Sequence, residues 1–229
     1  MTTAITGLSS MATRQILAEL AEAYEQRTGQ AATIRSVGGV EAAQLVRAGA
    51  RVDLVVLASG VMERLEAEGH LLAGSRLDFA RSGIAVAVPT GAQQPDLSHA
   101  EAVRQAILKA RRICYSTGPS GDHVVQLLQS WQMADVLSDR AIQAPAGVPV
   151  GSFLARGEAD LGFQQLSELL HVPGVDIVGP LPPEIQALTI FTLGIARASS
   201  QPGNARALVA FLASPEVATL KRRYGMEPA

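Results

Sequence analysis

The stretch Ala4-Ile5-Thr6-Gly7-Leu8-Ser9-Ser10-Met11 decides how this chain folds. A short apolar run passes through small polar residues into a periodic segment over 12–27, whose apolar stripe consists of Ile16, Leu17, Leu20, Ala21 and Tyr24. The change from strand to helix periodicity predicts a β-strand over 2–7, a tight turn at Ser9-Ser10 and an amphipathic helix, which Thr28-Gly29 ends.

Four later junctions repeat this order of apolar run, small-residue turn and helix-like segment. Their turns are Gly38-Gly39, Ala58-Ser59-Gly60, the segment 116–121 with Ser120 and Gly121, and Ala146-Gly147-Val148. The first N–H groups of a helix have no intrahelical partner and carry partial positive charge. Small residues let a ligand reach those groups, and serine hydroxyls add further donors. If the turns converge, they predict an anion-binding site.

Strand and helix signals alternate along the chain. Further strands are expected over 32–37, 52–57, 83–88, 112–116 and 186–197, and further helices over 40–48, 61–68, 98–111, 122–133, 150–156, 204–212 and 215–223. Ser98 and Glu101 indicate a capping box, and the run 180–183 indicates a surface connector. Strands separated by helices predict an α/β protein with mostly parallel sheets, which bind ligands beyond the carboxyl ends of their strands.

Composition excludes several functional classes. The 229 residues suit one large domain or two lobes, and a net charge of −2 with mixed signs argues against a nucleic-acid surface. No apolar run is long enough to span a membrane. Cys114 lies in a strand-like segment and is expected to be buried and inert. The histidines lack metal-ligand spacing and no cofactor motif is present, so we expect neither metal nor cofactor.

The N-terminus bears on where the protein works. Met1 is followed almost directly by the first expected strand, without the basic and apolar regions of a signal peptide. We expect a cytoplasmic protein as the chain stands, or a periplasmic one if a signal peptide was removed and a start methionine supplied.

Three segments carry a resemblance that covers essentially the whole chain. They are Leu8-Ser9-Ser10-Met11, the helix-to-strand junction 45–54, and the tail 211–226. The chain resembles the molybdate-binding proteins of ABC importers, within the type II periplasmic-binding-protein fold. This resemblance implies two hinged lobes, with residues 1–82 and 186–229 in one and 83–185 in the other, and an interlobe cleft that closes over a small anion. For an exported protein it also implies an ABC permease as partner.

The resemblance further implies ligand contacts at Ser10, Gly39, Ala58, Ser120, Val148 and Gln165. Two positions depart from the family pattern. Gly38-Gly39-Val40 stands where the family has a serine-rich turn, and Phe163-Gln164-Gln165 stands where it has a tyrosine hydroxyl. Two hydroxyl donors of the molybdate site are therefore missing, although a glycine N–H and a glutamine amide still donate.

The other candidate residues allow two interpretations each. Ser9 and Ser10 can cap the first helix, contact a ligand, or do both. Arg81 is either a solvated side chain or a two-donor clamp for a carboxylate. Adjacent glutamines suit a core poorly, so at least one of Gln164 and Gln165 should point into the cleft. No residue stands out as a catalytic base.

Two functions fit these features. The first is a solute-binding protein for a small polycarboxylate or an oxyanion such as molybdate. The second is an isomerase on the same scaffold, similar to aconitate isomerase, which shifts an allylic proton and needs carboxylate clamps and a proton shuttle. We predict binding as the main function. We expect a polycarboxylate to bind better than molybdate, because a tetrahedral oxyanion would lack two donors.

Overall fold

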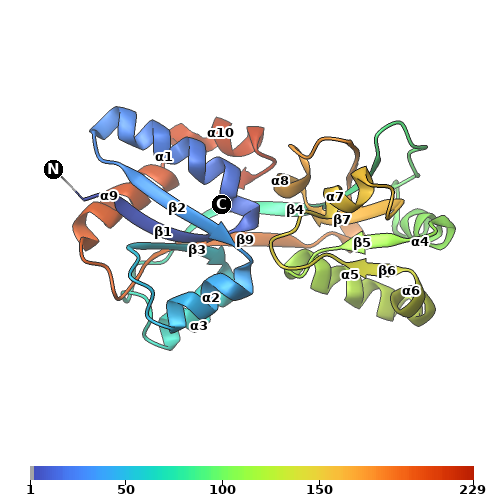
Figure 1. The fold of residues 1–229 in the computed structure, drawn as a ribbon, viewed down its shortest axis with the longest axis horizontal. Coiled ribbons are helices and arrows are strands. Elements are labelled where there is room, and N and C mark those ends of the chain that lie inside the picture. The colour runs from blue at the N-terminus through green and yellow to red at the C-terminus, as the bar shows by residue number, and fades with distance from the viewer. Residues whose placement is uncertain (1–2) are drawn as a thin grey trace. The chain divides into compact units, whose positions relative to one another are not determined.

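The computed structural model describes residues 3–229 and divides into two compact units (Figure 1). Unit 1 consists of the chain up to Arg81 together with Ile190–Ala229, and unit 2 is Ser82–Thr189. The second boundary falls four residues later than the expected 185/186. The residues just before this boundary form hydrogen bonds to other residues of unit 2. The Gln186 amide exchanges hydrogen bonds with the backbone of Ile84, and Gln165 Nε2 donates to Thr189 Oγ1.

The sheet of unit 1 is built around a parallel centre. Strand β1 (Ile5–Ser10) lies between β2 (Ala32–Val37) and β3 (Leu54–Ala58), and pairs in parallel with both. Strand β9 (Leu188–Ile195) runs antiparallel to β3, and β10 (Glu227–Pro228) pairs antiparallel with the start of β4 (Leu77–Pro89). Both β4 and β9 cross a unit boundary, so each contributes residues to both units.

Helices cover both faces of this sheet because the inner strands alternate apolar residues between two cores. Leu54 and Val56 pack with α1 (Arg14–Thr28), which a 3-10 turn precedes at Met11–Thr13, and with α9 (Pro202–Ala213). Val55 and Leu57 face α2 (Gly39–Arg47) and α3 (Ser59–Ala67). The closing elements, η3 (Pro215–Val217) and α10 (Ala218–Arg223), join the first core through Val217 and Leu220.

Unit 2 repeats the plan with shorter strands. Strand β5 (Ile113–Tyr115) pairs in parallel with β6 (Ala141–Gln143) and β7 (Leu161–Gln165). The second half of β4 runs antiparallel to β7 and to β8 (Val175–Pro180). Its helical segments are α4 (Ala100–Lys109), α5 (Pro119–Ser130), α6 (Ala134–Asp139), α7 (Val150–Ala155), α8 (Leu166–Leu169) and η2 (Pro183–Ile185). The α/β fold class is thus confirmed.

Several expected details are wrong for identifiable reasons. Strand β1 runs on to Ser10, so Ser9-Ser10 ends a strand; its expected start at Thr2 lies outside the described residues. The capping box does not form, because His99 Nδ1 caps α4 by accepting from Ala102 N. The run 180–183 is no surface connector, because Leu181 is buried in the core of unit 2. In the described part of the chain, no helix is long and apolar enough to cross a membrane.

Candidate ligand site

In unit 1, three candidate turns lie at one edge of the sheet. Parallel pairing places Ser10 opposite Val37 and Ser9 opposite Val56, so β1, β2 and β3 end at neighbouring positions. Beyond these ends α2 starts at Gly39 and α3 at Ser59, and no side chain caps either start. Their first N–H groups therefore face the same edge as Ser10, as anion binding requires.

The two serines of β1 have different roles. The Ser9 hydroxyl is fully buried and hydrogen bonded to Ser36 Oγ at 2.7 Å, so it holds β1 against β2. The Ser10 hydroxyl is buried without a partner, although the residue itself is 9% exposed. A buried hydroxyl without a partner is costly unless a ligand completes it. Ser10 thus keeps an unused hydroxyl at the end of β1, where the resemblance implies a ligand contact.

Val40 and Glu41 complete the α2 turn. Val40 is 65% exposed directly after the two glycines, so an apolar side chain is open to solvent beside this turn. Glu41 pairs with Arg35 at 3.5 Å on the exposed surface. Glu41 thus compensates the partial positive charge at the start of α2, and its carboxylate is exposed and paired, unlike that of a catalytic base.

In unit 2, the turn before α5 is closely packed. Ser120 Oγ is hydrogen bonded to Ser116 Oγ at 2.8 Å, and both serines are buried. A Cβ atom on Gly121 would lie 1.7 Å from the Ser116 carbonyl oxygen, so only glycine fits there. The N–H of Gly121 already donates to Gly118 O at 2.8 Å. Close packing alone accounts for Gly121, whatever it contributes to a ligand.

The turn before α7 also uses much of its backbone internally. Val148 N donates to Pro145 O at 3.0 Å, and Val150 N donates to Gln164 Oε1 at 2.9 Å. The Val148 side chain is 37% exposed. As with Val40, an apolar side chain thus stands open beside a candidate turn.

Gln164 and Gln165 are both 2% exposed and point to opposite faces of β7. Gln165 Nε2 donates to Thr189 Oγ1 at 2.7 Å, while its Oε1 is buried without a partner. Because the Thr189 hydroxyl can either donate or accept, a half-turn of the amide preserves this bond and places N–H donors at the unpartnered position. Gln165 can therefore serve either a carboxylate or a protonated carboxyl group.

The sequence did not single out Glu168. Its carboxyl is partly buried and accepts from Gln164 Nε2 at 2.9 Å. Burial raises the pKa of Glu168 to about 7, and the Gln164 hydrogen bond offsets only part of this rise. The available signal was its position four residues after Gln164, directly beyond a strand end. Such a carboxyl can exchange a proton at neutral pH.

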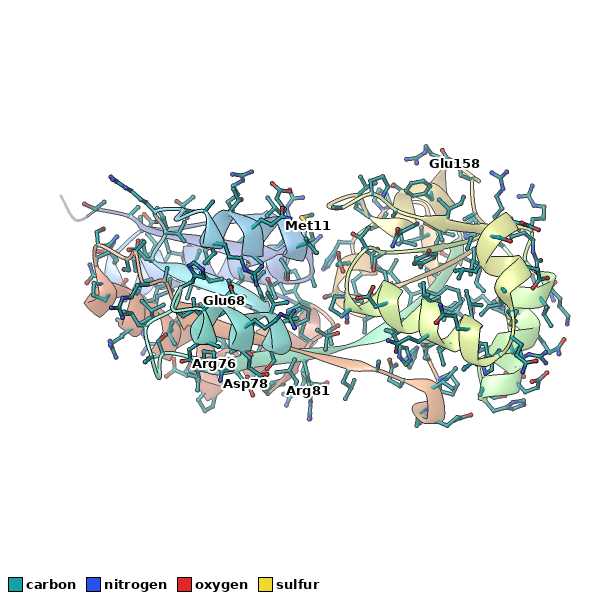
Figure 2. All side chains as sticks on the ribbon, turned by 90° about the horizontal axis from the view of Figure 1, so that it is seen from below. Met11, Glu68, Arg76, Asp78, Arg81 and Glu158 are labelled. Atoms are coloured by element: carbon teal, nitrogen blue, oxygen red, sulfur yellow. The ribbon has the colours of Figure 1, made fainter. Side chains whose placement is uncertain are left out.

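Arg81 lies on β4 in register with Glu227 of β10 and is exposed. Figure 2 shows its side chain on the same side of unit 1 as those of Arg76 and Asp78, extending away from the ribbon. Burial does not hold it in one rotamer, so a clamp role for Arg81 stays a prediction.

Buried side-chain atoms without a partner mark the strand ends. Within residues 3–229 they are Ser10 Oγ, Gln165 Oε1, Ser167 Oγ and Ser214 Oγ. All but Ser214 lie at the ends of β1 or β7, where the candidate turns are. Folded proteins leave few such atoms, so each one needs an explanation. Unused hydrogen-bonding capacity is thus found at the end of β1 in unit 1 and at the β7–α8 junction in unit 2.

Other chemistries have less support. Among the described residues, no group of three or more His, Cys, Asp or Glu side chains could hold a metal ion. Burial raises the pKa of Cys114 to about 12, which keeps its thiol protonated. His123 Nε2 is hydrogen bonded to Ile185 O at 2.7 Å. A surface hollow of about 650 Å³ against α4 is lined by none of the candidate residues.

The chain matches the family model described as bacterial extracellular solute-binding protein over residues 5–227. Among curated proteins, it is 38% identical over 233 residues to an aconitate isomerase from a Pseudomonas species. That alignment covers 99% of this chain and 88% of the relative.

Two solved structures share the fold. The periplasmic molybdate-binding protein of Azotobacter vinelandii superimposes with a TM-score of 0.82 at 22% identity, covering 97% of this chain and 98% of that one. A sulfate-binding protein of Mycobacterium tuberculosis gives a TM-score of 0.79 at 14% identity, covering 100% and 88%.

Proposed function

This chain belongs to the family of bacterial extracellular solute-binding proteins, and we propose that it binds a small organic polycarboxylate through its strand-end turns. The observation that carries the proposal is the unused hydrogen-bonding capacity of Ser10 and Gln165, one in each unit. Both are neutral groups, and neutral donors can bind an anion without an opposing charge.

Two features favour a carboxylate with a carbon skeleton over a tetrahedral oxyanion. The hydroxyl donors of the molybdate site are replaced here by Gly39 and Gln165. Val40 and Val148, both exposed beside candidate turns, offer apolar contacts that CH₂ groups can use and that an inorganic oxyanion cannot. Arg81, if its side chain reaches the ligand, adds the planar two-donor fork that carboxylates match.

A ligand panel tests the proposal. Citrate, trans-aconitate, cis-aconitate, molybdate, tungstate, sulfate and phosphate are compared by thermal shift, and each one that stabilises the protein is titrated calorimetrically. We expect a tricarboxylate to bind most tightly. The proposal is wrong if molybdate or tungstate binds and no carboxylate does.

Matched serine variants locate the site. Ser10→Ala removes the unpartnered hydroxyl at β1, and Ser214→Ala removes an equally unpartnered hydroxyl beyond α9. One lost hydrogen bond to a charged ligand weakens binding by about 1.5–3 kcal/mol, or roughly tenfold or more. We expect that loss for Ser10→Ala and for Gln165→Leu but not for Ser214→Ala. Equal effects of the two serine variants would remove Ser10 from the site.

Arg81 is tested by ligand type. Arg81→Ala should weaken tricarboxylate binding much more than any residual oxyanion binding, because only the planar carboxylate uses both guanidinium donors. Arg51→Ala, at another exposed arginine of unit 1, is the matched control. Tight molybdate binding that survives Arg81→Ala would show that the ligand of the molybdate-binding proteins has been kept.

A second candidate function is isomerisation of an unsaturated tricarboxylate. The 38% identity to an aconitate isomerase, extending over 99% of this chain, favours it, and so does a carboxyl group at Glu168 that titrates near neutral pH. Proton NMR of trans-aconitate with catalytic amounts of protein tests it, with the appearance of cis-aconitate as the positive result. Tight binding without conversion would leave the binding function alone.

The two functions imply different partners and locations. A solute-binding protein of an ABC importer delivers its ligand to a membrane permease, so the binding function includes export and a permease partner. An isomerase needs neither. Fractionation of cells that express the gene with its natural upstream sequence separates the two: release by osmotic shock supports the importer role, and retention in the cytoplasm supports the enzyme.

A further inference from the structure

The β7–α8 junction holds more unsatisfied polar chemistry than any other short segment that the structure describes. Gln165 Oε1 and Ser167 Oγ are buried without partners, in residues only 2% and 5% exposed. Glu168 follows directly, partly buried, with a neutral amide as its hydrogen-bond donor. An amide, a hydroxyl and a carboxyl group are thus concentrated within four residues at one strand end.

Gln164 connects Glu168 to a second candidate turn. Its Nε2 donates to Glu168 Oε1 at 2.9 Å, and its Oε1 accepts from Val150 N at 2.9 Å, at the start of α7. One amide therefore bridges the Glu168 carboxyl and the backbone that follows Val148. Gln164, itself a candidate for ligand contact, thus lies between Glu168 and the α7 turn.

The Gln164 amide is the hydrogen-bond donor to Glu168, and the two strands that pack against α8 bring no cation to it. Helix α8 packs against β7 and β8. Strand β7 carries no charged residue, and Asp176, the charged residue of β8, accepts from Gly91 N and Thr90 Oγ1. Arg156, after α7, is paired with Glu158, and the exposed His171 follows α8. A carboxyl group in neutral, buried surroundings keeps its proton up to a higher pH than usual. Burial raises the pKa of Glu168 in this way.

We propose that Glu168, held by the Gln164 amide at the end of β7, is the catalytic residue that moves the proton when this protein isomerises an unsaturated tricarboxylate. This inference rests on the second candidate function. It adds the base that the sequence alone did not reveal.

The step balances without metal, oxidant or nucleophile. Ionised Glu168 removes a proton from the CH₂ group of trans-aconitate, and the C–H electron pair moves into the adjacent double bond and its conjugated carboxylate. The same carboxyl group, now protonated, donates to the far carbon, so the double bond shifts by one position and Glu168 returns to its ionised form. A neutral donor such as the Ser167 hydroxyl would stabilise the negative charge that builds up on the substrate carboxylate.

The test compares the wild type with Glu168→Gln, Glu168→Asp and the control Glu158→Gln. Glu158 is an exposed carboxylate of the same unit, paired with Arg156 (Figure 2). Conversion of trans-aconitate and uptake of solvent deuterium are followed by proton NMR in D₂O, and binding is measured by calorimetry. A glutamine at 168 can still accept from Gln164 but cannot remove a proton.

If Glu168 moves the proton, Glu168→Gln lowers kcat by about 10²–10⁴-fold while the affinity for trans-aconitate stays close to that of the wild type. Glu168→Asp restores part of the activity, and Glu158→Gln leaves it unchanged. In the wild type, kcat/KM rises with pH through about 7, because the base must be ionised. This rise disappears in Glu168→Gln.

Each other outcome has a distinct meaning. If Glu168→Gln turns over like the wild type, Glu168 only positions Gln164 and the inference is wrong. If the wild type binds trans-aconitate but neither converts it nor exchanges its protons, the inference fails and the binding proposal stands. If no polycarboxylate binds at all, both fail.

Discussion

Asp53 in unit 1 and Glu168 in unit 2 are carboxyl groups with opposite environments. Asp53 is 3% exposed and accepts four hydrogen bonds, from Thr6 N, Thr6 Oγ1, Ser199 Oγ and Gln201 Nε2. Burial alone would raise the pKa of Asp53, but these donors outweigh it and hold the pKa below its ordinary value. Glu168 has the Gln164 amide, and burial raises its pKa to about 7.

The difference shows how one fold separates structural from chemical carboxyl groups. A carboxylate whose lone pairs are all used stays ionised and holds segments together: Asp53 joins β1 to the segment that precedes α9. A carboxyl group left with one neutral donor holds little together, but it can gain and lose a proton near pH 7. The number of donors, rather than burial alone, separates the two roles.

The largest effect should come from removing Asp53. Asp53→Ala leaves donors of Thr6, Ser199 and Gln201 without an acceptor, and we expect the free energy of unfolding to fall by about 3 kcal/mol or more. Urea unfolding at neutral pH measures this. Glu168→Ala is the comparison variant and should cost much less. Equal losses would mean that Glu168 is as structural as Asp53.

The next effect is the pH dependence of stability, which should have opposite signs for the two groups. The folded pKa of Glu168, about 7, lies above its unfolded value, so its contribution is complete below about pH 4.5 and is lost as the pH rises through about 7, by at most about 3 kcal/mol. The folded pKa of Asp53 is lowered, so its contribution is present above the unfolded pKa and is lost as the pH falls through the folded one.

Chemical denaturation between pH 4.5 and 8 checks the Glu168 part of this prediction. The glutamine of Glu168→Gln cannot titrate, so the difference in stability between wild type and variant should change across this range. A difference that does not vary with pH would show that Glu168 is ionised throughout, and that its environment resembles that of Asp53.

Much of unit 1 could be predicted from the sequence, because its turns carry local signals. The β2 limits agree with the expected 32–37. Glu168 could not be found in this way. Its pKa depends on burial and on Gln164, whose own partner, Val150 N, lies 14 residues earlier. Periodicity reports which face of an element is buried, but not which distant donors meet there.

Other differences come from hydrogen-bond partners that compete with the expected ones. Strand β4 begins at Leu77, six residues before the expected Gly83, because its first part pairs with β10 at the far end of the chain. The α4 cap falls on His99 because Ser98 N donates to the Asp96 side chain instead. A distant strand decides the boundary of β4, and a neighbouring side chain decides that of α4.

Lys221 extends the comparison to a buried cation. It is 2% exposed, its Nζ donates to Phe79 O at 2.7 Å and lies 4.5 Å from the centre of the Phe79 ring. Burial lowers the pKa of Lys221 to about 8, so the unfolded chain binds more protons between about pH 8 and 10.5. Stability should therefore rise with pH across that window, by about 2 kcal/mol, and Lys221→Met should remove the rise.

Urea unfolding at pH 7.5 and 9.5 measures the Lys221 effect, with Lys109→Met, at the end of α4, as the control. A wild-type stability that does not rise would mean that the Phe79 carbonyl and ring satisfy the ammonium as fully as four donors satisfy Asp53. The rule that neutral partners leave a buried charge titratable would then hold for carboxyl groups alone.

The smallest effect is expected from removing one of the four donors of Asp53. Thr6→Val keeps the side-chain shape and the backbone N–H, which donates at 2.9 Å, and deletes the hydroxyl that donates at 3.2 Å. One hydrogen bond to a charged acceptor is lost while three remain, so we expect a loss of about 1 kcal/mol and a pKa of Asp53 that is still below its ordinary value. Denaturation at pH 3 and pH 7 measures both. If the acid-induced loss of stability vanished with this single hydroxyl, the contrast with Glu168 would rest on one bond and not on the number of donors.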